Sequence, residues 1–300
     1  MQEENNRFFY KMIRPFPASC CSFLNSIVFQ GNTIKFVTRQ YSHFLLLLIF
    51  TERPKAFIMK ISLAQIQPFA GDIPRNVQLH RQAITLAVAQ QAEMIIFPEL
   101  SITGYEPTLA QQLASTPDEE SWKIFQQLSD ESTIVIGISL PLQTGNDINI
   151  GMLIFQPGEP VQVYTKQHLH EDELPFFVSG LPQNIRLNTA PDIAFAICYE
   201  ISVPSHSANA AANGAKIYLA SVAKTATGVD KAMETLAGIA GQYGMTVLMV
   251  NSTGYCDNFH ADGRSAIWKN DGTLAMQLDN TSQGILMIDT VTGETGSYYL

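Results

Sequence analysis

From residue 60 onward, the pattern of apolar and polar positions switches repeatedly between the period of a strand and that of a helix. Apolar and polar residues alternate through Lys60–Gln67, which predicts a strand with one buried face. Apolar residues then recur at helical spacing through Asn76–Gln91, and Asp72 precedes them as a candidate helix N-cap. The chain therefore begins this region with a strand that is followed by a helix.

The same alternation continues toward the C-terminus. Further strands are predicted over Met94–Phe97, Thr133–Leu140, Gly151–Phe155, Val161–Tyr164, Ile193–Ile197, Lys216–Ala220, Thr246–Val250, Ser265–Trp268, Thr273–Leu278 and, as the last one, Gly284–Ile288. Further helices are predicted over Glu119–Ser129, Pro204–Asn213 and Lys231–Tyr243. Strands that alternate with helices and hairpins indicate a layered α/β domain with mixed sheets.

Charge and glycine content divide the chain after residue 58. Residues 1–58 hold seven Lys/Arg, three Asp/Glu and one of the nineteen glycines, a net charge of +4, whereas residues 59–300 carry −13. The regular α/β pattern also begins directly after Met59. We interpret residues 59–300 as one domain. Residues 1–58 are interpreted as an N-terminal extension that is either poorly ordered or translated from upstream of a true start at Met59.

Composition argues against several classes of partner. The net charge of −9 disfavours nucleic-acid binding, which relies on Lys and Arg against phosphate. The apolar run Phe44–Phe50 is much shorter than the roughly 20 residues of a membrane helix, so no membrane association is expected. Cys198 and Cys256 do not suggest a disulfide framework, which indicates a reducing cytoplasm. No metal-ligand spacing and no phosphate-binding glycine loop is present, so we expect no cofactor.

Three residues with reactive side chains each follow a predicted strand. Cys198 comes directly after Ile193–Ile197, Glu99 comes shortly after Met94–Phe97, and Lys166 ends the strand before it. Taken singly, a buried thiol, a loop carboxylate and an exposed lysine are the ordinary interpretations. Strand ends are the usual reaction edge of an α/β sheet, however, and a thiol, a base and a cation together suit nucleophilic catalysis.

Two other arrangements fit catalysis less well. Cys256 lies near His260 in a predicted loop, but no third group that would orient the histidine is evident, so we interpret it as part of a pocket rim. His168 and His170 follow Lys166, and the acids around His170 favour a supporting or surface role.

Three short motifs occur in one order along the chain. They are Pro-Glu-Leu-x-x-x-Gly-Tyr at 98–105, Tyr-x-Lys-x-His-Leu at 164–169 and Ile-Cys-Tyr-Glu at 197–200. Together with the later Asn251, Gly254, Gly263, Ser265 and Gly272, they resemble the nitrilase-like carbon–nitrogen hydrolase superfamily from Met59 to about Leu286. The resemblance implies a four-layer α-β-β-α sandwich, and members of the family usually dimerise through helices on one face.

The resemblance also implies roles for individual residues. The family's catalytic triad falls on Glu99 as base, Lys166 as cation and Cys198 as nucleophile. A second active-site glutamate follows the lysine in many members, and Glu173 is our choice for it, although Glu171 leaves the register open. No metal or organic cofactor is implied.

Around this triad, Glu200 is implied to support the site, and the backbone N–H of Tyr199 to complete an oxyanion hole with the lysine. Tyr105, Phe177, Tyr199 and Ala223 are the candidate substrate-binding residues. Lys224 or Arg264 is a further candidate, for pairing with a substrate carboxylate.

The resemblance narrows the reaction and leaves the substrate open. True nitrilases of the family generally carry Trp after the nucleophile, where this chain has Tyr199, so an amide or N-carbamoyl substrate is favoured over a nitrile. The glutamine-dependent synthetase branch carries an attached ATP-using domain, for which we expect no room in this chain. A catalytically silent relative that acts as a binding or scaffold protein is the competing hypothesis.

Overall fold

The computed structural model describes residues 26–30, 33–37, 59–183, 185–188 and 193–300. The chain divides into two compact units, Met1–Arg53 and Pro54–Leu300, and each is described by itself. In the first unit, β1 (Ser26–Gln30) and β2 (Thr33–Val37) form an antiparallel pair. The expected boundary between an extension and a domain at residues 58 and 59 stays a prediction.

A seven-stranded sheet forms one half of the second unit, with the strand order β16-β15-β3-β4-β5-β6-β7. Its strands are β3 (Lys60–Gln65), β4 (Met94–Ile96), β5 (Val135–Thr144), β6 (Asp147–Phe155), β7 (Gln162–Thr165), β15 (Gly284–Asp289) and β16 (Thr295–Tyr299). Strands β3, β4 and β5 run parallel, and the other neighbours are antiparallel. The sheet is therefore mixed, as the alternation of strands, helices and hairpins predicts.

A five-stranded sheet forms the other half, with the order β14-β13-β10-β9-β8. Its strands are β8 (Ile193–Ile197), β9 (Ile217–Val222), β10 (Thr246–Asn251), β13 (Ala266–Trp268) and β14 (Leu274–Gln277). Strands β8, β9 and β10 run parallel, and β13 and β14 add an antiparallel edge. A separate hairpin consists of β11 (Thr253–Cys256) and β12 (Phe259–Asp262).

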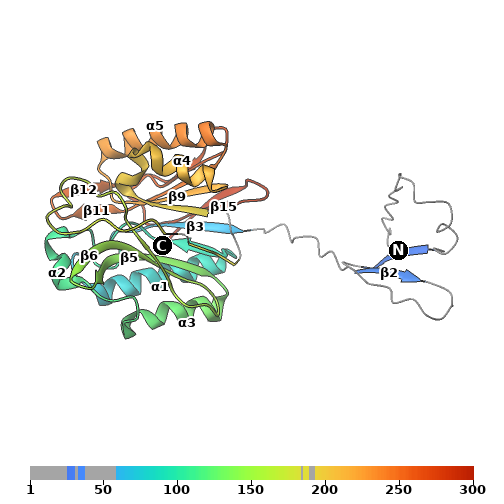
Figure 1. Cartoon of the computed structure of the whole chain (residues 1–300), viewed down its shortest axis with the longest axis horizontal. Coiled ribbons are helices and arrows are strands. Elements are labelled where there is room, and N and C mark those ends of the chain that lie inside the picture. The colour runs from blue at the N-terminus through green and yellow to red at the C-terminus, as the bar shows by residue number, and fades with distance from the viewer. Residues whose placement is uncertain (1–25, 31–32, 38–58, 184, 189–192) are drawn as a thin grey trace. The chain divides into compact units, whose positions relative to one another are not determined.

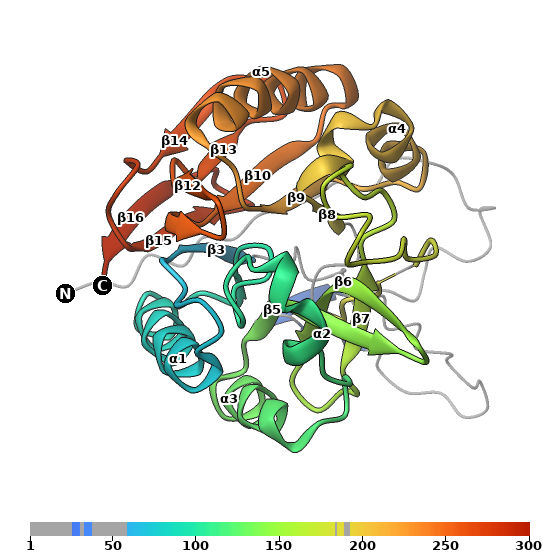
Figure 2. The same cartoon turned by 90° about the vertical axis from the view of Figure 1, so that its left-hand side faces the viewer.

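Helices cover the outer face of each sheet, which completes four layers (Figures 1 and 2). Helices α1 (Ile73–Ala89) and α3 (Lys123–Ser132) lie on the seven-stranded sheet, and α4 (Pro204–Ala212) and α5 (Ala226–Tyr243) lie on the five-stranded sheet. The short helices are η1 (Pro107–Leu109), α2 (Ala110–Leu113), η2 (Glu120–Trp122) and η3 (Cys198–Ser202). The predicted α-β-β-α sandwich is confirmed.

Alternation along the strands separates three apolar cores. In β3, Ile61 and Leu63 face the space between the sheets, whereas Ala64 faces α1. Across that space, Phe195 and Ile197 of β8 enter the same inter-sheet core. Because successive side chains of a strand point to opposite faces, one alternating sequence supplies both an inner and an outer layer. The inner layer is where the two sheets meet.

Helix α1 confirms the predicted cap. The Asp72 carboxylate accepts a hydrogen bond from the backbone N–H of Arg75 at 3.1 Å, and the helix begins at Ile73, before the predicted Asn76. Helix α5 begins at Ala226 rather than at the predicted Lys231.

The early start of α5 has a local cause. The side chain of Thr225 caps the helix by accepting a hydrogen bond from the N–H of Gly228 at 3.2 Å. Glycine and threonine are weak helix formers, so the spacing of apolar residues does not predict the first turn of α5, which the cap stabilises.

Two regions differ from the predicted elements. Gly284–Ile288 is not the last strand, because β16 follows it and pairs with β15 at the sheet edge. The residues around Cys256, predicted as a loop, form the β11–β12 hairpin. Strands β16 and β11 each carry a glycine and exposed tyrosine, so neither shows the apolar alternation that marks a half-buried strand.

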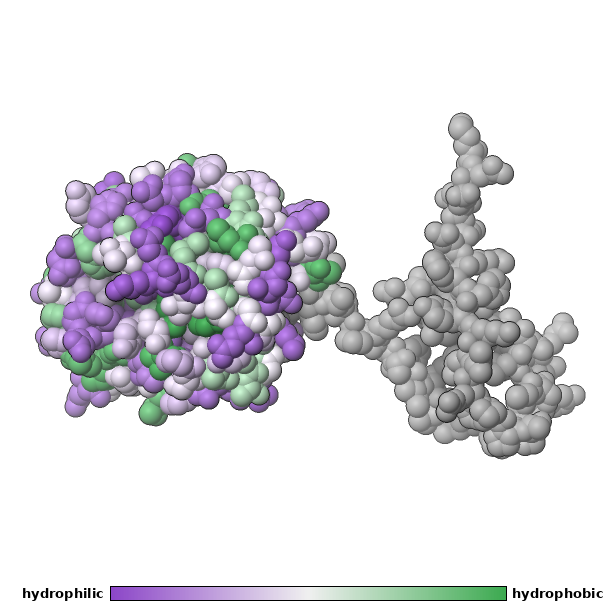
Figure 3. Space-filling view, turned by 90° about the horizontal axis from the view of Figure 1, so that it is seen from above, coloured by the Kyte–Doolittle hydropathy of each residue, from purple (hydrophilic) through white to green (hydrophobic). Residues whose placement is uncertain are grey.

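The surface of the second unit is mainly polar on the face in Figure 3, where apolar side chains occur in small groups. Within the described ranges, every helix is too short or too polar to cross a membrane.

A test of the outer core is the substitution Phe125→Ala on α3. Phe125 is fully buried, stacks on Phe155 and meets the edge of His80. Removing the ring leaves a cavity, so we expect the free energy of unfolding to fall by about 3–5 kcal/mol. Denaturant unfolding measures this loss. Val291→Ala, at an exposed position, should change it by less than about 0.5 kcal/mol, and equal losses in the two variants would contradict the packing assignment.

Candidate active site

The three reactive residues predicted at strand ends come together between the two sheets. Lys166 directly follows β7, Cys198 directly follows β8, and Glu99 lies in the turn after β4. Glu99 and Lys166 are fully buried, and Cys198 is half-buried. The seven-stranded sheet thus supplies the carboxylate and the cation, while the five-stranded sheet supplies the thiol.

The ammonium group of Lys166 bridges two buried carboxylates. Its Nζ lies 2.7 Å from Oε1 of Glu99 and 2.6 Å from Oε1 of Glu173. A buried charge is tolerated when it is paired and hydrogen-bonded, and here one cation satisfies two anions. Among the described residues, these contacts use two of the three N–H donors of the ammonium group, which leaves one for a ligand.

Glu173 belongs to this cluster, whereas Glu171 does not. Oε1 of Glu173 also accepts a hydrogen bond from the Tyr105 hydroxyl at 2.9 Å, and Oε2 accepts one from the backbone N–H of His170 at 2.8 Å. The side chain of Glu171 is exposed, as is that of Asp172. Among the three acidic residues at 171–173, Glu173 alone is buried against Lys166.

Cys198 occupies a strained turn. Its φ of +44° lies in the left-handed region, which a residue with a Cβ rarely adopts, and it joins β8 to the helix η3. Its Sγ lies 4.0 Å from the carbonyl oxygen of Ala223. This sharp strand-to-helix turn presents the thiol at the end of the sheet.

The Glu200 carboxylate fixes the backbone on both sides of this turn. Oε2 accepts a hydrogen bond from the N–H of Ile197 at 2.7 Å, and Oε1 accepts one from the N–H of Gln167 at 2.6 Å. Ile197 precedes Cys198, and Gln167 follows Lys166. One buried carboxylate therefore ties the nucleophile turn to the end of the lysine strand.

Burial controls the protonation of the carboxylate and the thiol. Burial raises the pKa of Glu99 to about 7 despite the opposing charge of Lys166. Burial and the Glu99 carboxylate raise the pKa of Cys198 to about 11. Burial alone lowers the pKa of Lys166, but Glu99, Cys198 and Glu173 raise it overall. Near neutral pH, the thiol thus carries its proton, the lysine is charged and Glu99 is poised to exchange a proton.

The turn that carries Glu99 is braced by polar groups that the motifs do not reveal. Leu100 has a φ of +53°, and its N–H donates to Oγ of Ser139 at 2.9 Å. Ser221 of β9 donates to the carbonyl oxygen of Phe97 at 2.8 Å, which joins the two sheets beside the site. These serines lie in apolar strands, and only their burial in the folded chain identifies them.

The four candidate substrate-binding residues lie in different environments. Tyr105 and Ala223 are buried, with the contacts to Glu173 and Cys198 described above. Tyr199 is 37% exposed, and its ring meets His170 edge-on. Phe177 is buried in the inter-sheet core. Their role in binding stays a prediction.

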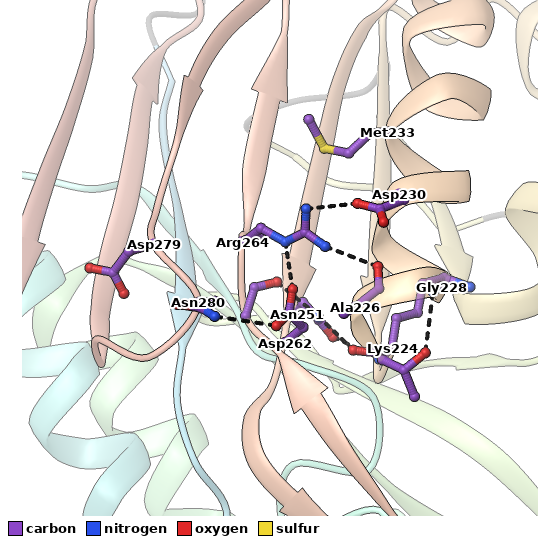
Figure 4. A network of polar contacts seen from close by, with 12 residues as sticks. Lys224, Ala226, Gly228, Asp230, Met233, Asn251, Asp262, Arg264, Asp279 and Asn280 are labelled. Carbon is purple, nitrogen blue, oxygen red and sulfur yellow. Dashed lines mark hydrogen bonds and ion pairs between the residues drawn. The ribbon is translucent and has the colours of Figure 1, made fainter.

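Lys224, the residue after Ala223, is held by Asn251 at the end of β10 and by the backbone N–H of Asp262 in β12 (Figure 4). Asn251 accepts a hydrogen bond from the N–H of Lys224 at 2.9 Å. The guanidinium group of Arg264 contacts Asp230 at 2.9 Å and Asp262 at 2.6 Å. Arg264 therefore links α5 to β12, which argues against a role in binding a substrate carboxylate.

No group of three or more His, Cys, Asp or Glu within the described ranges is arranged to hold a metal ion. Cys256 is buried, and burial raises its pKa to about 12.

The chain matches a known family over almost all of the second unit. The family model of carbon–nitrogen hydrolases covers residues 60–299. The chain belongs to the carbon–nitrogen hydrolase family. The resemblance that the sequence motifs indicate is thereby confirmed.

Relatives within this family are distant. The glutamine-dependent NAD(+) synthetase of Acinetobacter baylyi is 28% identical over 228 residues, which are 73% of this chain and 41% of that protein. A protein of Staphylococcus aureus described as a hydrolase in the agr operon is 23% identical over 239 residues, 77% of this chain and 90% of that protein. This chain thus spans less than half of the synthetase and most of the hydrolase.

Solved structures share the fold. An amidase from Nesterenkonia sp. AN1, with the acetamide moiety of fluoroacetamide added covalently at its active-site cysteine, aligns with a TM-score of 0.70. It is 22% identical, and the match covers 78% of this chain and 91% of that chain. A cysteine-to-serine mutant of this nitrilase-superfamily amidase aligns with a TM-score of 0.71 at 23% identity, over 78% and 92% of the two chains. At these identities, the likeness shows the fold.

The cluster leads to a test of the two glutamates. Glu173→Gln removes one of the two anions that hold the Lys166 ammonium group, so we expect turnover of a C–N substrate to fall about 100-fold. Glu171→Gln removes an exposed charge and should leave turnover within about twofold. Steady-state kinetics of both variants decide this, and a loss in Glu171→Gln equal to that in Glu173→Gln would reverse the assignment.

Proposed function

We propose that this chain hydrolyses a non-peptide C–N bond of a small amide or N-carbamoyl compound through a thioester on Cys198. The observation that carries this proposal is the buried bridge of Lys166 between Glu99 and Glu173, beside a half-buried thiol. The family membership supports the reaction class. Ammonia or an amine is the first product.

The first half of the reaction forms the thioester. Glu99 accepts the proton of the Cys198 thiol while the sulfur attacks the carbonyl carbon. The remaining N–H donor of Lys166 and the backbone N–H of Tyr199 stabilise the oxyanion, and one such donor contributes about 10²–10³ in rate. Glu99 then returns the proton to the leaving nitrogen as the C–N bond breaks.

The second half regenerates the thiol. Glu99 takes a proton from water, the hydroxide attacks the thioester carbon, and the C–S bond breaks. The sulfur leaves as thiolate and recovers a proton from Glu99, so that a carboxylic or carbamic acid is released. Glu173 keeps the Lys166 ammonium group in place through both halves, because the two groups lie 2.6 Å apart. No cofactor enters these steps.

Several observations favour an amide or N-carbamoyl substrate over a nitrile and favour an enzyme over a silent scaffold. Tyr199 stands where nitrilases of the family carry Trp, which disfavours nitrile hydrolysis. All three proposed catalytic groups are present and adjoin one another, which disfavours a silent scaffold. The glutamine-dependent synthetases among the relatives make the side-chain amide of glutamine a compound to test beside simple amides and N-carbamoyl amino acids. A cytoplasmic location and a homodimer stay predictions.

The nucleophile is tested by comparing the two described cysteines. Cys198→Ala removes the attacking sulfur, so we expect ammonia release from the substrate panel to fall at least about 10⁴-fold. Cys256→Ala removes a buried thiol of raised pKa and should retain activity. Mass spectrometry after iodoacetamide treatment should place the label on Cys198. Unchanged turnover in Cys198→Ala would refute the mechanism.

The pH dependence tests Glu99 as the base. Only the carboxylate accepts a proton, and its pKa is raised to about 7, so kcat/KM should fall about tenfold per unit as the pH drops below 7. If kcat/KM instead began to fall only near pH 4.5, the ordinary pKa of glutamate, this role would be contradicted. His170→Gln serves as the control, because the pH at which kcat/KM falls should stay the same when this exposed histidine is removed.

A further inference from the structure

A chain of buried polar side chains lies behind the site and is not used by the proposed mechanism. It runs from Tyr218 of β9 through His206 of α4 and Tyr164 of β7 to Glu200 of η3. All four residues are buried. Because unsatisfied polar groups are costly in a core, the burial of four hydrogen-bonded polar side chains requires a physical reason.

The hydrogen bonds between these four side chains all run in one direction, from Tyr218 toward Glu200. The single hydroxyl hydrogen of Tyr164 goes to Oε2 of Glu200 at 2.7 Å. The Tyr164 oxygen therefore accepts from Nε2–H of His206 at 3.0 Å. With that proton on Nε2, the neutral ring accepts at Nδ1 from the Tyr218 hydroxyl at 2.8 Å. The carboxylate thus sets the direction of the hydrogen bonds that Tyr164, His206 and Tyr218 donate in this series.

Geometry also favours the neutral form of His206. A second ring proton would turn Nδ1 into a donor and leave the Tyr218 hydroxyl hydrogen without an acceptor among the described residues. Burial lowers the pKa of His206, and the neighbouring His168 lowers it further, although the Glu200 carboxylate opposes both. The groups that face the ring are Glu200, His168, Tyr164 and Tyr218.

This series of hydrogen bonds ends at Glu200, which contacts the backbone that carries the proposed catalytic residues. Glu200 accepts hydrogen bonds from the N–H groups of Ile197 and Gln167, which adjoin Cys198 and Lys166 in sequence. A shift of the carboxylate would therefore move the thiol relative to the lysine. A misplacement of about 1 Å is enough to cost roughly 10²-fold in rate.

We propose that His206 is a positioning residue that holds Glu200, through Tyr164, where it spaces Cys198 from Lys166. This inference rests on the proposed function, in which the distance between Cys198 and Lys166 matters for catalysis. His206 itself lines a separate cavity of about 300 Å³ between β7, β8 and α4, together with His168, Asn209 and Asn213. Its effect on catalysis is therefore expected in kcat rather than in KM.

The test compares two substitutions of His206. His206→Leu removes both ring nitrogens, and we expect kcat to fall about 10- to 100-fold with KM within about twofold. His206→Gln restores one N–H donor toward Tyr164 and one acceptor toward Tyr218, so it should recover most of the loss. Recovery by the amide distinguishes hydrogen-bonded positioning from simple filling of space.

A matched control is available in the neighbouring histidine. The His168 ring meets the His206 ring edge-on at a centroid distance of 6.2 Å, and within the described ranges it makes no side-chain hydrogen bond. His168→Leu applies the same change in the same cavity and should leave kcat within about twofold. If His206→Leu does not fold, Tyr218→Phe removes only the last hydroxyl and should lower kcat about 3- to 10-fold.

A second readout separates this proposal from the proposed function. The rate at which iodoacetamide alkylates Cys198 needs no substrate, and it should fall in His206→Leu and recover in His206→Gln. Turnover absent in the wild type, together with this alkylation pattern, would sink the proposed function and keep the positioning role. The role of His206 would be overturned if His206→Leu kept the alkylation rate and the kcat of the wild type. It would also be overturned if His206→Leu, His206→Gln and His168→Leu lowered kcat and the alkylation rate equally.

Discussion

The buried ammonium group of Lys166 between two carboxylates is the interaction on which the rest of the site depends. It joins the end of β7 to the turn after β4 and to the turn that carries Glu173. Removing Lys166 would leave two buried carboxylates without a counter-charge, which costs several kcal/mol, and removing either carboxylate would leave one N–H donor of the buried ammonium group without its partner. The three segments are therefore constrained to one arrangement, and the thiol of Cys198 meets that arrangement from the opposite sheet.

The sandwich explains how residues so far apart in sequence come together. Strands β4 and β7 belong to one sheet and β8 to the other, and their ends meet because the inner faces pack on a shared apolar core. Backbone close contacts complete the fit. A Cβ on Gly180 would lie 2.1 Å from Oγ1 of Thr165, and the Gly180 N–H donates to the carbonyl oxygen of Lys166 at 2.7 Å. Only glycine allows this approach beside the lysine.

Much of this arrangement could be predicted from the sequence, and the remainder depends on contacts between distant segments. Alternating strands, the Asp72 cap and three reactive residues after strands are local signals, and they predict a mixed α/β domain with these residues at strand ends. The four-layer sandwich and the roles of Glu99, Lys166 and Cys198 are implied by the family motifs. The choice between Glu173 and Glu171 was open, because only burial against Lys166 separates two glutamates so close in sequence. His206 gave no signal, since its partners come from other strands.

The strained turns at Cys198 and Leu100 show why the core contains so many polar groups. Each left-handed conformation costs on the order of 1–3 kcal/mol and persists only when its surroundings enforce it. Ser139 holds Leu100 and is itself anchored on the carbonyl oxygen of Gly151 at 2.8 Å, while Glu200 holds the residue before Cys198. Buried polar side chains that look out of place in an apolar strand therefore mark the supports of the site, and they lie one contact away from the groups proposed to react.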